Sequence, residues 1–440
     1  LLIFLLVLIV SSTTNKLLTF LPMPLIQILL GIGIGLCLPN NQYHLDTELF
    51  LALVIGPLLF REAQEADITS ILKHWRIVLY LIFPVIFISA LSMGGLAHVL
   101  WASLPLAACV AVGAALGPTD LVAFASLSDR FTFPKRVSNI LKGEGLLNDA
   151  SGLVAFRVAL IAWTTGTFSL TQAGTSLAIS IVGGFAVGFI TALINRFLHT
   201  FLLSVRATDI ASELLLELSL PLLTFFIAEE IHVSGIIAVV VAGILKASRF
   251  KKINLLEAQV DTVTETVWHT VTFMLNGSVF VILGMELEMI AEPILKSAFY
   301  NNVLLLITIF LLTFLLFAIR FVMIYGFYAF RIKKLHKSLD KYVKDMLLLT
   351  FSGVKGTVSI ATILLIPSNL EQEYPLLLFL VAGVTLVSFL TGLLVLPHLS
   401  EEKEPSKDRL MHIAILNDVA MELEKDLENT KNKVPLYAAI

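Results

Sequence analysis

Four ionisable side chains lie deep inside apolar stretches of this 440-residue chain, where an unsolvated charge is costly and usually has a function. They are Asp120, Asp149, Arg320 and Lys355. Asp149 lies eleven residues after Ser138, where its stretch begins. A helical rise of about 1.5 Å per residue therefore places its carboxylate roughly 16 Å deep, near the middle of a bilayer. The other three have similar depths, although two structural ion pairs between helices would account for the same four charges.

Asp149 belongs to a predicted helix face of small and polar residues. Glu144, Gly145, Asn148, Asp149 and Gly152 have the spacing i, i+1, i+4, i+5 and i+8 that places residues on one face. Small residues let a second backbone approach, or leave room for a hydrated ion. A sodium-sized cation prefers oxygen ligands, which a carboxylate and its neighbours supply. Because burial disfavours a charged carboxylate, Asp149 could bind either a cation or a proton, and this competition would be sufficient for exchange.

Two of the apolar stretches are interrupted near the predicted midplane by glycine and proline. One contains the sequence GPTD at 117–120, and the other contains SGVKG at 352–356. A pair of broken helices in the two halves of a transporter indicates an ion site. The half-helix ends carry partial charges, which Asp120 and Lys355 are placed to complement. Two kinked helices without any site are the alternative interpretation.

The composition predicts that these residues are positioned by membrane-spanning helices. The chain is 57% hydrophobic and 14% charged, whereas soluble domains carry about 25% charged residues. Its net charge of −3 gives no sign of nucleic-acid binding. We therefore expect an all-α polytopic membrane protein with about 13 spans. Their approximate limits are 1–12, 17–38, 47–60, 77–98, 104–128, 138–163, 173–196, 208–228, 233–246, 262–285, 302–330, 346–366 and 374–397. The fifth and the twelfth are the broken ones.

The basic residues of the loops predict an orientation. Odd-numbered loops and the helix ends beside them carry twenty lysines and arginines, whereas the even-numbered loops carry only Lys296. This asymmetry is the positive-inside pattern, so we expect an inner cell membrane protein with its N-terminus outside. Residues 1–399 would form the membrane domain. Residues 400–440 would be a cytoplasmic tail, which three-four spacing of apolar residues predicts to be partly an amphipathic helix; a partly ordered, solvated tail fits equally well.

Several motifs in these stretches resemble the NhaP-type sodium/proton antiporters, which are bacterial relatives of the eukaryotic NHE exchangers. The matching segments are GPTDLVAF at 117–124, GEGLLNDASGLV at 143–154, LSLPLLTFFIAEEIHVSGIIAVVVAGIL at 218–245, FMLNGSVFVILGMEL at 273–287 and FSGVKGTVS at 351–359, together with the region of Arg320. The resemblance implies thirteen spans in an inverted repeat, with a dimerisation domain and a mobile core domain. It also implies a homodimer that exchanges Na⁺, Li⁺ or K⁺ for H⁺ and contributes to pH homeostasis.

The resemblance also assigns an ion-binding group. Asp149 matches the aspartate that binds the cation, Na⁺ here, or the proton, and Asn148 matches the asparagine beside it. Thr119 and Asp120 match the pair on the broken helix next to that aspartate. The electrogenic relatives have an aspartate at the position of Asn148, where it would add a second proton site. Asn148 therefore predicts electroneutral, one-for-one exchange, in agreement with the single net negative charge of the predicted midplane group.

A second group would support the site without binding the ion. Glu144 and Arg320 match a buried pair that steadies the core, and Lys355 stands where the family usually has arginine. Gly145 occupies a position that is often serine in relatives, so a hydroxyl ligand is absent. Glu62 could align with a third-span acid of some relatives, but Arg61 intrudes next to it.

Other charged residues could belong to an ion path or to its rim. Glu213 and Glu217, one turn apart near the inner end of their span, could line a cytoplasmic entrance or could belong to a solvated helix end. Arg157 is expected to extend to the outer interface or to form a pair near the outer face.

No cofactor is expected, and the alternatives to an antiporter are a proton-coupled symporter for a small solute and a cation channel. Small residues around one net negative charge suit an ion better than an organic molecule. An embedded enzyme is disfavoured, because no HExxH pair, GxSxG elbow or phosphate-binding glycine loop is present.

Overall fold

The computed structural model describes residues 2–17, 23–37, 47–66, 68–120, 123–124, 131–166, 170–205, 209–247, 255–296, 301–335, 342–363, 365–366 and 374–400. The regular elements within these ranges are all helices. This confirms the all-α prediction, as expected for a chain whose backbone must satisfy its hydrogen bonds within lipid. The predicted tail lies outside the described residues, apart from Ser400.

The helices of the first half are α1 (Leu2–Leu17), α2 (Met23–Cys37), α3 (Thr47–Phe50), η1 (Leu51–Ile55), α4 (Gly56–Glu65), α5 (Ile68–Lys73), α6 (Trp75–Tyr80), η2 (Leu81–Val85), α7 (Ile86–Leu100), α8 (Leu106–Ala115) and α10 (Lys135–Thr165). Those of the second half are α11 (Leu170–Ser204), α12 (Ile210–Glu230), α13 (Gly235–Ala247), α14 (Leu255–Lys296), α15 (Asn302–Leu335), α16 (Val343–Phe351), α17 (Thr357–Ile363) and α18 (Tyr374–Leu399).

Six helical segments of the described chain are long and apolar enough to cross a membrane. They are Trp75–Leu100, Ala178–Ser204, Ile210–Glu230, Thr262–Glu288, Asn302–Arg331 and Tyr374–Leu399. Five shorter apolar helices overlap other predicted spans. Large apolar side chains such as Phe314 and Leu394 are exposed on the outside, as expected for surfaces that face lipid. The total of thirteen spans and the inverted repeat stay predictions.

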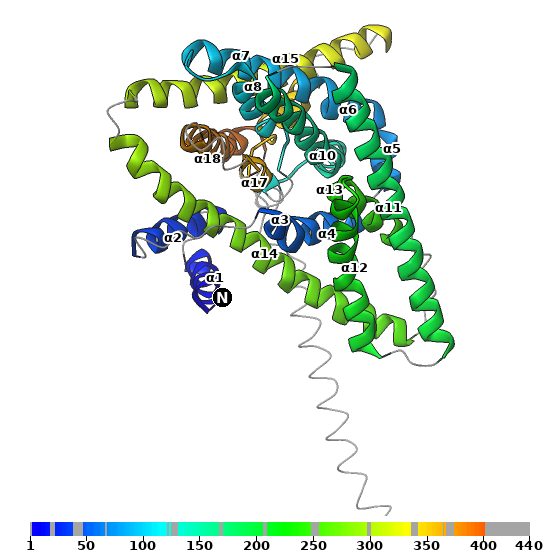
Figure 1. The fold of residues 1–440 in the computed structure, drawn as a ribbon. Helices are drawn as coiled ribbons and strands as arrows, with labels where there is room; N and C mark the ends of the chain where they lie inside the picture. Colours follow the sequence, from blue (N-terminus) through cyan, green and yellow to red (C-terminus); the bar gives the residue numbers. More distant parts are fainter. Residues whose placement is uncertain are drawn as a thin grey trace, which may run out of the picture.

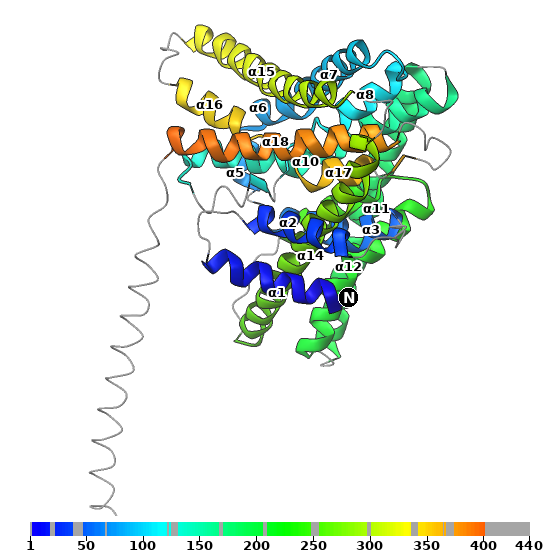
Figure 2. The ribbon, with the colours of Figure 1, turned by 90° about the vertical axis from the view of Figure 1, so that its left-hand side faces the viewer.

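The helices form two groups that pack against each other (Figures 1 and 2). We call α5–α8, η2, α10 and α15–α18 the crossing bundle, because it contains both broken helices. We call α1–α4, η1 and α11–α14 the flanking bundle. Close backbone approach holds the flanking bundle together: a side chain at Gly243 of α13 would overlap the carbonyl of Phe60 on α4. Glycine is required there because any larger residue would separate the two helices.

Both predicted helix breaks are present, and the two broken chains touch. Helix α8 ends at Ala115 before the Gly117-Pro118 sequence, and α16 and α17 are separated by the non-helical residues 352–356. The amide of Asp120 donates to the carbonyl of Val354 at 3.1 Å. Gly356 is packed so closely on the Asp120 carboxylate that it has no room for a β-carbon. The Gly/Pro pattern thus produces two crossing helices whose open backbones meet in the interior.

Candidate ion-binding site

Asp149 and Asn148 lie on α10 beside the break that follows α8. Both are buried, with exposed fractions of 3% and 0%. The side-chain amide nitrogen of Asn148 donates to the carbonyl of Thr119 at 3.3 Å. The Oδ1 of Asn148 and the Oδ1 of Asp149 have no hydrogen-bond partner. Buried oxygens without partners are rare in proteins, because they lose their hydration without compensation. These two oxygens therefore point to a bound ion or proton.

Glu144 lies on the same helix and has a partner within the chain. Arg320 of α15 grips its carboxylate in a bidentate pair, with Nη1–Oε1 and Nη2–Oε2 distances of 2.5 and 2.7 Å. Both side chains are buried, and the Nε of Arg320 donates to the carbonyl of Leu349 on α16 at 3.0 Å. The charge of Glu144 is thus neutralised in place, and the pair ties α10 to α15 and to the second broken helix.

The side chain of Thr119 hydrogen-bonds to both members of the Glu144–Arg320 pair. Its hydroxyl donates to Glu144 at 2.9 Å and accepts a hydrogen bond from Arg320 at 3.1 Å. Its carbonyl accepts from Asn148. Thr119 therefore connects the neutral Glu144–Arg320 pair to the residue beside Asp149, and its hydroxyl is already engaged on both sides.

Lys355 and Asp120 lie at the ends of the broken helices. The ammonium group of Lys355 donates to the carbonyls of Gly117 and Pro118 at 2.7 and 2.6 Å. These carbonyls follow the C-terminal end of α8, where the helix dipole favours a cation. Asp120 Oδ1 accepts from the amide of Ala123 at 2.8 Å. Asp149 lies within electrostatic range of both Asp120 and Lys355.

Of the two glycines on the α10 face, Gly152 allows the close approach that the sequence predicts as one of two possibilities. A β-carbon at Gly152 would overlap the ring of Pro118, so its absence lets the break pack on α10. Gly145 is buried one turn before Asp149 and offers no side-chain oxygen.

Glu62 of α4 faces this group from the flanking bundle, within electrostatic range of Asp149 and Asp120. The expected intrusion of Arg61 does not occur. Arg61 is turned away, to Glu65 at 2.6 Å and to the side-chain oxygen of Gln64 at 2.9 Å. Glu62 thus lies near enough to the site, across the boundary between the two bundles, to influence its charge.

The two other candidate acids, Glu213 and Glu217, have partners within the flanking bundle. Glu217 is buried and pairs with Lys246 of α13 at 2.8 Å. Glu213 lies 2.9 Å from His199 of α11. Neither side chain is freely solvated, because helices α11 and α13 cover this part of α12. This tertiary packing could not be predicted from the sequence.

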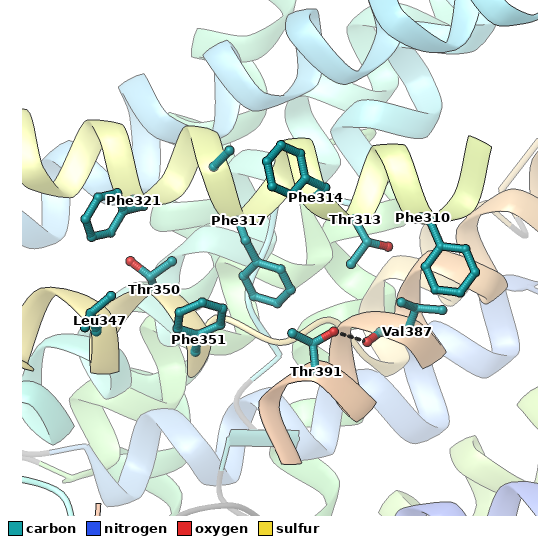
Figure 3. A pocket seen from close by; sticks show the side chains of 11 residues that line it. Phe310, Thr313, Phe314, Phe317, Phe321, Leu347, Thr350, Phe351, Val387 and Thr391 are labelled. Carbon is teal, nitrogen blue, oxygen red and sulfur yellow. Dashed lines mark hydrogen bonds between the residues drawn. The ribbon is translucent and has the colours of Figure 1, made fainter. Parts of the chain in front are cut away.

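A cavity of about 480 Å³ opens elsewhere, between α15, α16 and α18. Its lining includes five phenylalanines and three threonines, whose side chains Figure 3 shows around the cavity. The hydroxyls of Thr313, Thr350 and Thr391 each donate to their own helix backbone. Because the lining carries no charge, this cavity does not suit an ion.

Arg157 has a partner across the bundle boundary. Its guanidinium lies 3.5 Å from Glu229 at the end of α12, and both side chains are about one third exposed. A pair is one of the two arrangements expected for Arg157, and its location at the outer face stays a prediction.

Crossing broken helices beside a buried carboxylate on a third helix define an ion-coupled transporter fold. The chain belongs to the family described as "sodium/hydrogen exchanger, transmembrane", which it matches over residues 1–401, and it is a multi-pass membrane protein. This confirms the family that its motifs resemble.

Two curated relatives are named sodium, potassium, lithium and rubidium/H⁺ antiporters. The one from Bacillus pumilus is 33% identical over 96% of this chain and 62% of its own length. The one from Bacillus subtilis is 35% identical over 89% and 60%. The chain thus spans under two thirds of each relative. The fold also matches the sodium proton antiporter MjNhaP1 from Methanocaldococcus jannaschii, with a TM-score of 0.65, 18% identity and coverage of 90% of this chain and 95% of that one.

Proposed function

We propose that the chain exchanges a monovalent cation, Na⁺, Li⁺ or K⁺, for a proton at Asp149. The observation that carries this proposal is the pair of buried, unpartnered oxygens on Asn148 and Asp149. The names of the two Bacillus relatives support the same substrates. A carboxylate beside neutral oxygen ligands suits a hard monovalent cation.

The exchange follows from competition for one carboxylate. An empty, ionised Asp149 is costly to bury, so it binds either the cation or a proton before the crossing bundle moves. Asn148 supplies a neutral oxygen to the ion, and Asp120 adds negative charge from the broken helix. Lys355 keeps the carbonyls of the break occupied, so that they do not compete for the cation.

The stoichiometry we infer is one proton for each cation. Asn148 carries no charge, so one carboxylate on α10 changes its state in each cycle. Glu62, which faces the same space, adds a further acid to the group that the sequence predicts. Electroneutral exchange therefore requires Glu62 to keep one protonation state throughout the cycle.

The architecture supports two further proposals. The crossing bundle would be the mobile core, and the flanking bundle, within residues 1–399, would be the dimerisation domain of a homodimer. The protein would lie in the cell membrane with its N-terminus outside and residues 400–440 in the cytoplasm. No enzymatic activity is proposed.

The test is proton movement in proteoliposomes that hold an internal pH gradient. We expect external Na⁺, Li⁺ or K⁺ to dissipate the gradient at a rate that an imposed membrane potential does not change, and Asp149→Asn to abolish the effect. A channel would instead carry current without proton exchange, and a symporter would move protons in the direction of its solute. Retained exchange in Asp149→Asn would overturn the site.

A further inference from the structure

A second buried ion pair lies in the flanking bundle, outside the candidate site. Glu217 of α12 and Lys246 of α13 are 2.8 Å apart, with side chains 8% and 10% exposed. Lys246 also donates to Asn195 of α11 at 3.1 Å, and Asn195 donates to the carbonyl of Leu216 at 3.2 Å. The pair therefore links three helices through directed hydrogen bonds.

The pair reaches α4 through one residue. The side-chain amide of Gln64 donates to Glu217 Oε1 at 2.5 Å, while Lys246 occupies Oε2. Arg61 donates to the oxygen of Gln64 and pairs with Glu65. We call Gln64, Glu217, Lys246 and Asn195 the anchor network. In the described chain, none of its buried side-chain polar atoms lacks a hydrogen-bond partner. Fully hydrogen-bonded networks of this kind fix the geometry of the groups they join.

Gln64 and Glu62 lie on different sides of α4. Residues two positions apart on an α-helix are separated by about 200° around its axis, so they do not share a face. One side of α4 is thus held by the anchor network. Glu62 lies on another side of α4, which also packs against α10, and is within electrostatic range of Asp149. The close packing of Gly243 on Phe60 brings α13 against α4. The Gln64 hydrogen bond adds a directed contact that restrains the rotation of α4 about its axis.

We propose that the anchor network positions Glu62 opposite Asp149, and that Gln64, Glu217 and Lys246 are positioning residues for cation binding. The proposal rests on the proposed exchange at Asp149. Glu217 would then be a fixed hydrogen-bond acceptor for Gln64, and the transported ion would not bind to it. A looser α4 would change the electrostatic field that Glu62 exerts at the ion. We therefore expect a larger change in the apparent cation affinity than in the maximal rate.

Gln64→Met tests this, because methionine nearly preserves the shape and leaves the Glu217–Lys246 pair intact. We expect the KM for Na⁺ to rise about five-fold, the factor that one buried hydrogen bond represents, with the maximal rate within about two-fold of wild type. Thr200→Val is the matched control, since the hydroxyl of Thr200 bonds only to its own helix at the exposed end of α11; its KM should not change.

A double-mutant cycle separates positioning from general loosening. Glu62→Asp moves the carboxylate back by one methylene and keeps its charge. If Gln64 acts through Glu62, Gln64→Met should raise KM by less than about two-fold in the Glu62→Asp background, because coupled residues are not additive. Full additivity would overturn the proposal, as would an unchanged KM in Gln64→Met.

Glu217→Gln provides a second variant, which keeps an acceptor for Gln64 and removes the anion opposite Lys246. We expect a rise in KM in the same direction. Should both variants lose their monodisperse, folded state in detergent, the network would be a stability element and the positioning role would be wrong. Failure of exchange in wild-type proteoliposomes would instead refute the proposed function, and it would be seen before any variant is made.

Discussion

Glu144 and Asp149 lie five residues apart on one buried helix, yet the structure treats them differently. Glu144 has two hydrogen bonds from Arg320 and one from Thr119. Asp149 has an oxygen with no partner and shares the space with Asp120, Lys355 and Glu62. Glu144, in direct contact with its counter-ion, holds the helices together. Asp149 has no direct ion pair among the described contacts and an unpartnered oxygen, so we infer that it is left to bind an exchanging ion.

Removing the built-in counter-ion should give the largest effect. Arg320→Met leaves Glu144 buried without its cation, which costs about 3–5 kcal/mol for a broken buried pair. We expect a large fall in thermal stability measured in detergent. The double variant Glu144→Gln/Arg320→Met should recover much of this loss, because no unpaired charge remains. If the double variant were as unstable as Arg320→Met, the loss of stability could not be assigned to the unpaired charge of Glu144.

Adding a second acid beside Asp149 should change the energetics of transport. Asn148→Asp creates a further proton site, and each charge that crosses 100 mV is worth about 2.3 kcal/mol. We expect exchange that an imposed potential accelerates or slows according to its sign. The measurement is Na⁺-driven pH-gradient dissipation with and without a diffusion potential set by a permeant anion, since K⁺ is itself a proposed substrate, with wild type as the unresponsive control.

Two substitutions of Lys355 distinguish the role of its charge from that of its geometry at the break after α8. Lys355→Met leaves the carbonyls of Gly117 and Pro118 without their donor, and loss of a charged hydrogen bond of about 1.5–3 kcal/mol should slow exchange by ten-fold or more. Lys355→Arg keeps the charge, so it should retain clearly more activity than Lys355→Met. Equal activity of the two variants would contradict a role for this cation. Initial rates in proteoliposomes decide between these outcomes.

Arg157 should give the smallest effect. Its pair with Glu229 is about one third exposed at 3.5 Å, and exposed pairs contribute about 0–1 kcal/mol. We expect Arg157→Gln to change the exchange rate by less than about three-fold. A loss comparable to that of Lys355→Met would place Arg157 within the ion path and would revise the boundary of the site.

Much of this arrangement could be predicted, because depth and helix breaks are local properties of the chain. Counting residues from the charged ends placed Asp149 and Arg320 at one depth, and Gly117-Pro118 marked the first break. The direction of a side chain could not be predicted in the same way, since one residue is about 100° of helix. Arg61 and Glu62 are neighbours in the sequence, yet they serve different sides of α4. The burial of Glu217 depends on α13, which supplies its partner Lys246 and is brought there by tertiary packing.

The central claim is that a cation and a proton compete for the carboxylate of Asp149. It is tested most directly by counting protons released when Na⁺ is added to the purified protein in weakly buffered detergent solution at mildly acidic pH. We predict close to one proton for each Na⁺ bound by the wild type and none from Asp149→Asn. Sodium binding without proton release, or release that persists in Asp149→Asn, would contradict the account.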